Sequence, residues 1–362
     1  MKPKEFFKSK KSWSVIKDKI LGWYLVPYLT KVSKFNRLIV VVDGFAGVGL
    51  YKDGSEGSPI IICKTIEKLR KKGVKAITIL IDSNKECFDE LKKNVKKYEN
   101  SKIAFPEFGS FNDLTPIIIK ETEGLPVFFY IDPFGIKSIE FKCLEKIFEK
   151  VKRSSTEVLI NFNYKALRRE AEAYPELTKK VMNGIWYREI LKDKTLSDEQ
   201  KEEIILENYK DLYQKYFNFI GSCPVMYKDE QDAKYHLIFA TSHFDGLRLM
   251  NDIMGDVYRD FYSKGRLFDI TPPKKRRDLE LLEKNILGLA KEIGIINRAK
   301  IKEILIPRLF MRYKESDYNQ VISRLIKEEK IYSETGKVRV NDLTLISLTK
   351  FPRKSKNSII KV

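Results

Sequence analysis

Short apolar runs rich in β-branched residues alternate with amphipathic segments through residues 38–163. Strands that read as continuous apolar runs and alternate with helices predict a parallel sheet covered on both faces. The predicted strands are 38–43, 76–82, 102–105, 127–132 and 157–163. The pattern therefore predicts a doubly wound α/β domain, which would bind its ligand at the carboxyl ends of the strands, beside the first strand.

Elements on either side complete this domain. An apolar stripe with helical spacing in residues 13–37 predicts a helix that covers one face of the sheet. Residues 164–222 are mostly helical and are expected to form an insertion. Two strands at 224–228 and 235–242, joined by a short turn, predict an antiparallel pair at the sheet edge, which raises the count to seven. A helix is expected to follow from Phe244.

The carboxy-terminal part has a different pattern. Helices are predicted at 279–293, 299–306 and 315–328, followed by a hairpin within 331–348. Three helices and a two-stranded wing predict a winged helix, which is a helix-turn-helix variant. The expected organisation is a basic helical segment at 1–37, an α/β domain at 38–263, a basic linker at 264–277, a winged helix at 278–349 and a basic tail at 350–362.

Composition narrows the class of protein. The chain has 362 residues, of which 43% are hydrophobic and 33% charged, as in soluble proteins of two or more domains. No apolar run approaches the roughly 20 residues that span a bilayer, and the first residues lack the apolar core of a signal peptide. We therefore expect a cytoplasmic protein without a membrane partner.

Cysteine and histidine are too sparse for a metal centre. The four cysteines lie far apart without a C-x-x-C pair, and each has apolar neighbours, so we expect them to pack as small hydrophobic residues in the core. The two histidines, His236 and His243, are not spaced as a metal pair. No metal is expected.

Charge is distributed unevenly. The formal net charge is +19, and residues 1–37, 264–277, 298–314 and 350–362 contribute +8, +5, +5 and +5, so the remainder is slightly acidic. Basic ends around a nearly neutral middle favour a polyanionic partner, either DNA or RNA. Lysine as surface filler is the alternative explanation.

A glycine-rich turn, Asp43 to Gly49 (DGFAGVG), follows the first strand. Its glycines allow a tight turn and close approach to a ligand, and we expect them to leave N–H groups free to donate. The turn has no G-x-G-x-x-G pattern and no Walker lysine. Asp82, which closes the second strand, could take both hydroxyls of a ribose, but it lies too far downstream for a dinucleotide fingerprint.

Polar side chains also follow the third and fourth strands. Asn112 and Asp113 could face an adenine edge, although Asp113 is equally explained as a helix N-cap. After the fourth strand come Asp132, Pro133 and Phe134. A carboxylate followed by a proline and an aromatic ring suits an amino-bearing ring, because the carboxylate accepts from the N–H groups while the aromatic face stacks. A turn that caps the next helix is the alternative.

Together these motifs resemble class I S-adenosylmethionine-dependent methyltransferases, and more specifically the three-Cys-motif partner protein family, TcmP. The resemblance covers about residues 13–262 and rests on W-x-x-x-K (Trp13, Lys17), Tyr24-Leu25, Tyr28, DGFAGVG, Gly57-Ser58-Pro59, IDPFG, Asn161 to Asn163 and LIFATSHFDG. It implies a Rossmann-like methyltransferase fold, S-adenosylmethionine as cofactor and a three-Cys-motif protein as a partner. The carboxy-terminal segment resembles the winged-helix appendage of some members.

The resemblance also assigns roles. The residues implied for the cofactor, with the ribose on Asp82, are Asp43, Gly44, Phe45, Ala46, Gly47, Gly49, Asp82, Ser83 and Asp113. The residues implied to face the methyl acceptor are Asp132, Pro133, Phe134 and Gly135. Methyltransferases that act on nucleic-acid amino groups usually carry D/N-P-P-Y/F. Here Phe134 replaces the second proline and Gly135 the aromatic residue, which weakens the case for base chemistry.

The expected function is therefore methyl transfer to nucleic acid, with a base amino group as the leading acceptor. The alternative is a catalytically vestigial protein that binds nucleic acid or docks on a partner, in a system of the mobile-element or defence type. The residues expected to contact nucleic acid are Lys274, Lys275, Arg276, Arg277, Arg308, Arg312, Lys314 and Arg324. Gly57 to Pro59 could be a substrate loop or a helix start, and His243 a base or, preferably, a helix cap.

Overall fold

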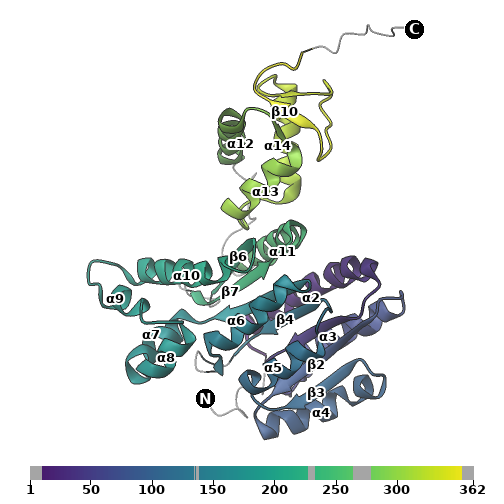
Figure 1. Cartoon of the computed structure of the whole chain (residues 1–362), viewed down its shortest axis with the longest axis vertical. Coiled ribbons are helices and arrows are strands. Elements are labelled where there is room, and N and C mark those ends of the chain that lie inside the picture. Colours follow the sequence, from purple (N-terminus) through teal and green to yellow (C-terminus); the bar gives the residue numbers. More distant parts are fainter. Residues whose placement is uncertain (1–9, 134, 136–137, 227–232, 264–278, 353–362) are drawn as a thin grey trace. The chain divides into compact units, whose positions relative to one another are not determined.

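The chain divides into two compact units, residues 1–267 and 268–362. The computed structural model describes residues 10–133, 135, 138–226, 233–263 and 279–352 (Figure 1). The predicted basic linker, 264–277, and the basic tail beyond residue 352 lie outside these ranges.

A seven-stranded sheet forms the centre of the first unit. Its strands are β1 (Ile39–Asp43), β2 (Ala76–Asp82), β3 (Ala104–Phe108), β4 (Val127–Ile131), β5 (Thr156–Phe162), β6 (Phe219–Met226) and β7 (Ala233–Thr241). They lie in the order β3-β2-β1-β4-β5-β7-β6, in which β7 is antiparallel to both of its neighbours and the pairs from β3 to β5 are parallel. The predicted doubly wound, mostly parallel sheet of seven strands is confirmed.

Helices cover both faces of this sheet (Figure 1). One face carries α2 (Ser12–Val32), α3 (Ser58–Arg70), α4 (Lys85–Asn100) and α11 (Phe244–Ser263), and the 3-10 turn η1 (Ser33–Phe35) follows α2. The other face carries α5 (Phe111–Glu121), α6 (Phe141–Glu149), the 3-10 turn η3 (Lys150–Lys152), α7 (Tyr164–Ala173), α8 (Pro175–Val181), α9 (Tyr187–Lys192) and α10 (Asp198–Gln214). All residues of β1 and β4 are buried, which explains why these strands read as continuous apolar runs.

Two strands differ from the prediction by more than two residues at one end, and both are edge strands. β3 is Ala104–Phe108 rather than 102–105, because Pro106 and Glu107 interrupt the apolar pattern. A proline is tolerated there because an edge strand has one side without ladder hydrogen bonds. β6 begins at Phe219, five residues before the predicted start, and its burial alternates along the strand. Edge strands lack the continuous apolar signal that identified the central ones.

A buried polar cluster fixes α2 to the sheet. The Tyr24 hydroxyl donates to Oε2 of Glu157 on β5 at 2.6 Å, and the Thr241 hydroxyl of β7 donates to Oε1 at 2.8 Å. Burial raises the pKa of the Glu157 carboxyl to about 7, against the lowering effect of these two hydrogen bonds. The cluster fixes the position of α2 and of every side chain that α2 carries.

Over residues 279–352, the second unit holds three helices and a small antiparallel sheet. Its elements are α12 (Glu280–Ile293), β8 (Ile296–Asn297), α13 (Arg298–Arg308), α14 (Glu315–Lys327), β9 (Tyr332–Ser333) and β10 (Leu345–Ser347). The sheet order is β8-β10-β9. β8 was not predicted, since two residues are too few to give a periodic signal. The three helices and the two strands β9 and β10 were predicted. The assignment to the winged-helix class remains a prediction.

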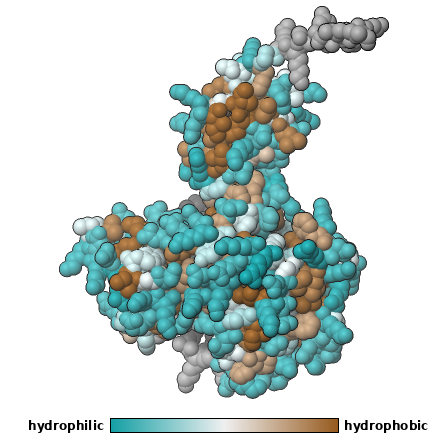
Figure 2. Space-filling view, in the orientation of Figure 1, coloured by the Kyte–Doolittle hydropathy of each residue, from teal (hydrophilic) through white to brown (hydrophobic). Residues whose placement is uncertain are grey.

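The environment of the cysteines agrees with the expectation from the sequence. All four cysteines are buried and unbonded, as the prediction of small core residues required. Within the described ranges, no helix combines the length and the apolar character needed to cross a bilayer. Hydrophilic side chains dominate the visible face of the first unit, whereas the second unit shows an apolar patch between α12 and α14 (Figure 2).

Candidate functional site

A cleft opens where β1 and β4 end, with an empty volume of about 790 Å³. The chain leaves β1 toward β2 on one side, while β4 lies on the other, so this is the point where the strand order reverses and open α/β sheets bind ligands. Four parts of the chain line the cleft: α2, the glycine turn with the segment that follows it, the ends of β4 and β5, and β7. The lining residues are, in that order, Trp13, Ser14, Lys17 and Asp18; Phe45 to Gly47, Gly49, Tyr51, Gly57 and Ser58; Asp132, Pro133, Asn161 and Asn163; and Lys234 and Tyr235.

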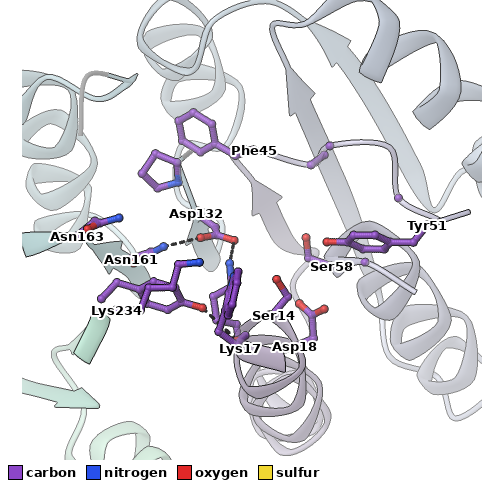
Figure 3. A pocket seen from close by; sticks show the side chains of 17 residues that line it. Ser14, Lys17, Asp18, Phe45, Tyr51, Ser58, Asp132, Asn161, Asn163 and Lys234 are labelled. Carbon is purple, nitrogen blue, oxygen red and sulfur yellow. Dashed lines mark hydrogen bonds and ion pairs between the residues drawn. The ribbon is translucent and has the colours of Figure 1, made fainter. Parts of the chain in front are cut away.

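Asp132 lies at the centre of the cleft. Its Oδ2 pairs with the Lys17 ammonium, and its Oδ1 accepts a hydrogen bond from Nδ2 of Asn161 at 2.8 Å (Figure 3). The Lys17 side chain is only 9% exposed and its ammonium also lies 5.3 Å from the centre of the Tyr235 ring. The carboxylate is thus held in one orientation by two partners from different elements.

Asn161 contributes a second acceptor beside Asp132. Because its amide nitrogen donates to Asp132, its Oδ1 is the atom left over, and this oxygen is buried without a hydrogen-bond partner among the described residues. Buried polar atoms are nearly always satisfied, so an orphan acceptor in a cleft indicates a missing donor. An incoming N–H or O–H group would satisfy it.

The glycine turn is closed by its own hydrogen bonds. Gly44 N–H donates to Tyr130 O at 2.9 Å and Ala46 N–H to Ile81 O at 2.8 Å. Phe45 N–H donates to Oδ1 of Asp43 at 3.3 Å. The expectation that these glycines leave their N–H groups free is therefore wrong for Gly44 and, as the Asp82 contact shows, for Gly47. The reason is that Gly44 and Ala46 lie against the ends of β4 and β2, where the next-to-last carbonyls of these strands accept their N–H groups.

Asp82 completes this closure. Its Oδ2 accepts from Gly47 N–H at 2.9 Å and its Oδ1 from Asn84 N–H at 2.7 Å, and the residue is 7% exposed. Asp82 is absent from the lining of the main cleft. A carboxylate has about four acceptor positions, so two remain for ligand hydroxyls. The first structural role of Asp82 is to tie the glycine turn to the end of β2.

Two further carboxyl groups on the cleft side are buried. Burial raises the pKa of Asp43, which is fully enclosed beneath the turn, to about 7. Burial likewise raises the pKa of Asp18 to about 6, although the Lys10 ammonium at 2.5 Å acts in the opposite direction. A nearby cation would stabilise the charged form of both carboxyls, whereas an anion would destabilise it. This part of the site therefore suits a cationic ligand better than an anionic one.

The remaining residues expected at the cofactor site lie at its margin. Gly44 faces the Phe111 ring, which would be 2.7 Å from a Cβ there, so only glycine fits. Ser83 is exposed after β2. Asp113 is not the N-cap of α5: Ser110 is, and Asp113 accepts from the Ser110 hydroxyl at 2.6 Å within the first turn. Phe134 lies outside the described residues, and Gly135 borders a smaller hollow that shares Pro133 and Asn161 with the cleft.

Two ambiguous motifs are clarified. Gly57 is the N-cap of α3 with Pro59 in its first turn, while Gly57 and Ser58 also line the cleft, so the motif starts a helix and forms part of the site wall. His243 immediately precedes α11 and its carbonyl accepts from Gly246 N–H at 2.9 Å, which is the position of a helix start. His243 is not among the cleft residues.

The basic residues expected to meet nucleic acid are dispersed. Lys274, Lys275, Arg276 and Arg277 lie outside the described residues. Arg308 and Arg312 are exposed at and after the end of α13, and Lys314 precedes α14. Arg324 pairs with Glu283 at 2.6 Å. Lys302, in the same basic stretch, is buried in ion pairs with Glu315 and Asp342, both at 2.7 Å, so part of this charge serves the fold.

Several cleft residues had no role in the sequence-based site. Lys17 and Asn161 were noticed only as parts of motifs, and Ser58, Lys234 and Tyr235 had no individual role. The position of Asn161 near the end of a central strand was a usable signal. Lys17 lies 115 residues from Asp132 in the chain, and nothing in a helical stripe indicates which strand end it will reach.

Comparison with known proteins gives similarity of fold. No family model matches the chain, and no curated protein matches it. Among solved structures, protein LPL1258 from Legionella pneumophila is 8% identical with a TM-score of 0.44, over 68% of this chain and 92% of that one. The METTL16 methyltransferase domain is 11% identical with a TM-score of 0.34, over 60% and 66%. The plantazolicin methyltransferase BamL, solved with SAH, is 13% identical with a TM-score of 0.31, over 70% and 77%. At these values the similarity carries no information on substrate or activity.

Proposed function

We propose that the chain is an S-adenosylmethionine-dependent methyltransferase that acts on nucleic acid, with a base amino group as the leading acceptor. The observation that carries the proposal is the cleft at the ends of β1 and β4, where the glycine turn faces the fixed carboxylate of Asp132.

The cleft residues fit such a cofactor. Ala46, Gly47 and Gly49 present a wall with little side-chain bulk, which allows close approach of a flexible ligand. Asp18 lies on the cleft wall and Asp43 beneath the turn, where carboxylates would favour the cationic methionine part. In the proposal, Asp82 holds the ribose through its two remaining acceptor positions, and Ser83 and Asp113 lie on the side of the adenine.

Bound S-adenosylmethionine would supply an electrophilic methyl group. Asp132 would accept one N–H of the acceptor amine, and the orphan Oδ1 of Asn161 would accept the second. Two acceptors in fixed positions turn the nitrogen lone pair toward the methyl group, and such positioning supplies much of the acceleration in group transfer. Lys17 and Pro133 would keep Asp132 in place. A duplex base would have to leave the stack to reach this depth.

Labelled-methyl transfer tests the proposal. The full chain would be incubated with methyl-labelled S-adenosylmethionine and total RNA or DNA, beside Asp132→Ala. We expect label in one nucleic acid with the wild type and a loss of at least 100-fold with the variant. Transfer that survives Asp132→Ala would refute the role of Asp132, and isothermal titration without heat at high cofactor concentration would refute the enzyme.

A second candidate function is partner docking by a protein whose methyltransferase cleft is vestigial. It is favoured by the apolar patch that the second unit shows (Figure 2). Ile293, the last residue of α12, and Ile295 after it are also about half exposed. The partner could be a three-Cys-motif protein. Affinity for nucleic acid that stays flat as salt rises would favour docking, because phosphate contacts lose affinity steeply with salt.

A further inference from the structure

The insertion between β5 and β6 forms a second hollow, separate from the cleft. Residues of α7, the start of α8, α9 and the start of α10 enclose an open groove with an empty volume of about 1680 Å³. Segments 164–217 contain eleven basic and eleven acidic residues and are therefore neutral overall. The groove lining is not neutral: five of its ten residues are basic and two are acidic.

The groove cations are Arg168, Arg188, Lys192, Lys194 and Lys201. Arg188 donates to the carbonyl of Pro175 at 3.2 Å and Lys201 to the carbonyl of Leu191 at 3.1 Å. Carbonyl partners orient these cations without cancelling their charge. Arg168 pairs with Asp198, but both side chains are 56% exposed, where an ion pair exchanges partners at little cost.

The groove is joined to the cleft by one helix. Asn163 lines the cleft and is the N-cap of α7, its side chain accepting from Ala166 N–H at 2.9 Å. Arg168 lies five residues further along α7, which is about 7.5 Å at the rise of an α-helix. A chain that places one residue in the cleft would therefore reach the groove with the residues next to it.

We propose that this insertion groove binds the sugar-phosphate backbone of the substrate strand beside the reacting nucleotide. The proposal rests on the proposed function, in that it takes the substrate of the cleft to be a nucleic acid. Phosphates spaced along a strand match several cations that line one groove, and exposed lysines suit a sequence-independent contact. The groove would set which part of a strand enters the cleft, whereas the second unit would add affinity.

Binding of a labelled single strand at several salt concentrations tests the groove. The probe is a fluorescent 20-nucleotide single strand of mixed sequence, as RNA and as DNA, followed by anisotropy with the full chain. The main variant is Lys192→Gln with Lys194→Gln, because both side chains are exposed and their loss cannot disturb packing. The matched control is Lys71→Gln with Lys72→Gln, also exposed, which follow α3 at the amino ends of the strands, away from the cleft.

We expect the groove variant to bind at least fivefold more weakly at 0.1 M salt. Its slope of log affinity against log salt should fall by about 1.4, since each lost phosphate contact on a single strand accounts for about 0.7. Adding Arg188→Gln should lower the slope further. The control should match the wild type. Equal affinities and slopes for the groove and control variants would overturn the proposal, as would a groove effect with an acidic peptide but none with either strand.

The same samples separate this proposal from the proposed function. Isothermal titration with S-adenosylmethionine should give the same affinity for the wild type and the groove variants. If cofactor binds but neither strand does, the groove proposal fails and a methyltransferase of another substrate stands. If strands bind through the groove but no cofactor binds, the proposed enzyme fails and the groove stands.

Discussion

Lys17 on α2 and Asp132 after β4 form an ion pair at the centre of the cleft, although 115 residues separate them in the chain. The ammonium fixes one carboxylate oxygen while Asn161 fixes the other. The carboxylate that we propose to orient the methyl acceptor therefore depends on a helix from the other side of the cleft.

Replacement of that ammonium should impair transfer more than cofactor binding. We expect Lys17→Met to lower the rate of methyl transfer about 100-fold, because a displacement of about 1 Å at a reacting group has an effect of this size. Cofactor affinity by titration calorimetry should change by less than threefold, and Lys17→Arg should recover part of the rate. Lys19→Met, which removes a surface pair with Asp260, is the control. Full activity of Lys17→Met would exclude the positioning role.

Removal of the Asp82 carboxylate should release the glycine turn. Asp82→Ala takes away the acceptor of the Gly47 and Asn84 N–H groups, so we expect cofactor affinity to fall at least tenfold. Binding of a single-stranded oligonucleotide should be unchanged, because the groove and the second unit are not touched. Calorimetry and anisotropy on one preparation measure both. An unchanged cofactor affinity would mean that neither the tether nor the proposed ribose contact matters.

The buried carboxyl of Glu157 makes stability dependent on pH. Burial raises its pKa in the folded chain to about 7 from the ordinary value of 4.5, so the folded state retains a proton that the unfolded state has lost. The free energy of unfolding should therefore fall as pH rises from about 4.5 to 7 and level off above. Asp18, with a pKa of about 6, and Asp43, at about 7, act with the same sign.

Urea unfolding at pH 5, 6, 7 and 8 measures this effect. Glu157→Gln should flatten the profile, because an amide in this cluster has no proton to lose. Glu203→Gln, at an exposed position of α10, should keep the wild-type slope. A profile for Glu157→Gln as steep as that of the wild type would assign the pH dependence to other groups.

Two helix glycines should respond to alanine with opposite signs. A Cβ at Gly246 would lie 2.7 Å from Oε1 of Glu157 and 3.2 Å from the Tyr24 hydroxyl, so we expect Gly246→Ala to destabilise the first unit by about 1–3 kcal/mol. A Cβ at Gly288 in α12 meets nothing within 4 Å, and Gly288→Ala should stabilise its helix by about 0.5–1 kcal/mol. Urea unfolding compares them. Stabilisation by Gly246→Ala would show that the cluster of Tyr24, Glu157 and Thr241 can rearrange at little cost in free energy.

The sequence was most informative where burial is complete. β1 and β4 are buried at every position and were predicted within one residue at each end, and the acceptor carboxylate Asp132 followed from the end of β4. The apolar pattern of an edge strand such as β3 is weaker, because one side of the strand has no neighbouring strand and its side chains are less buried.

The contacts between elements could not be predicted. The glycine turn was expected to offer its N–H groups to a ligand, yet Asp82 and the carbonyls of Ile81 and Tyr130 accept most of them. The approach of α2 to Asp132 depends on where the helix lies on the sheet, and its apolar stripe does not determine that position. Residues 164–217 hold as many basic as acidic residues, and the sequence does not indicate which of them line the insertion groove. Only the folded backbone decides this.

Because α2 precedes the first strand in the chain, a single cut would separate the cleft residues that it carries from the sheet. A piece beginning at residue 38 would keep all seven strands and the whole glycine turn, but would lack Trp13, Lys17 and Asp18. A synthetic peptide of residues 10–37 added to that piece should then restore activity in proportion to its occupancy. The proposed activity would then depend on whether this one helix is bound.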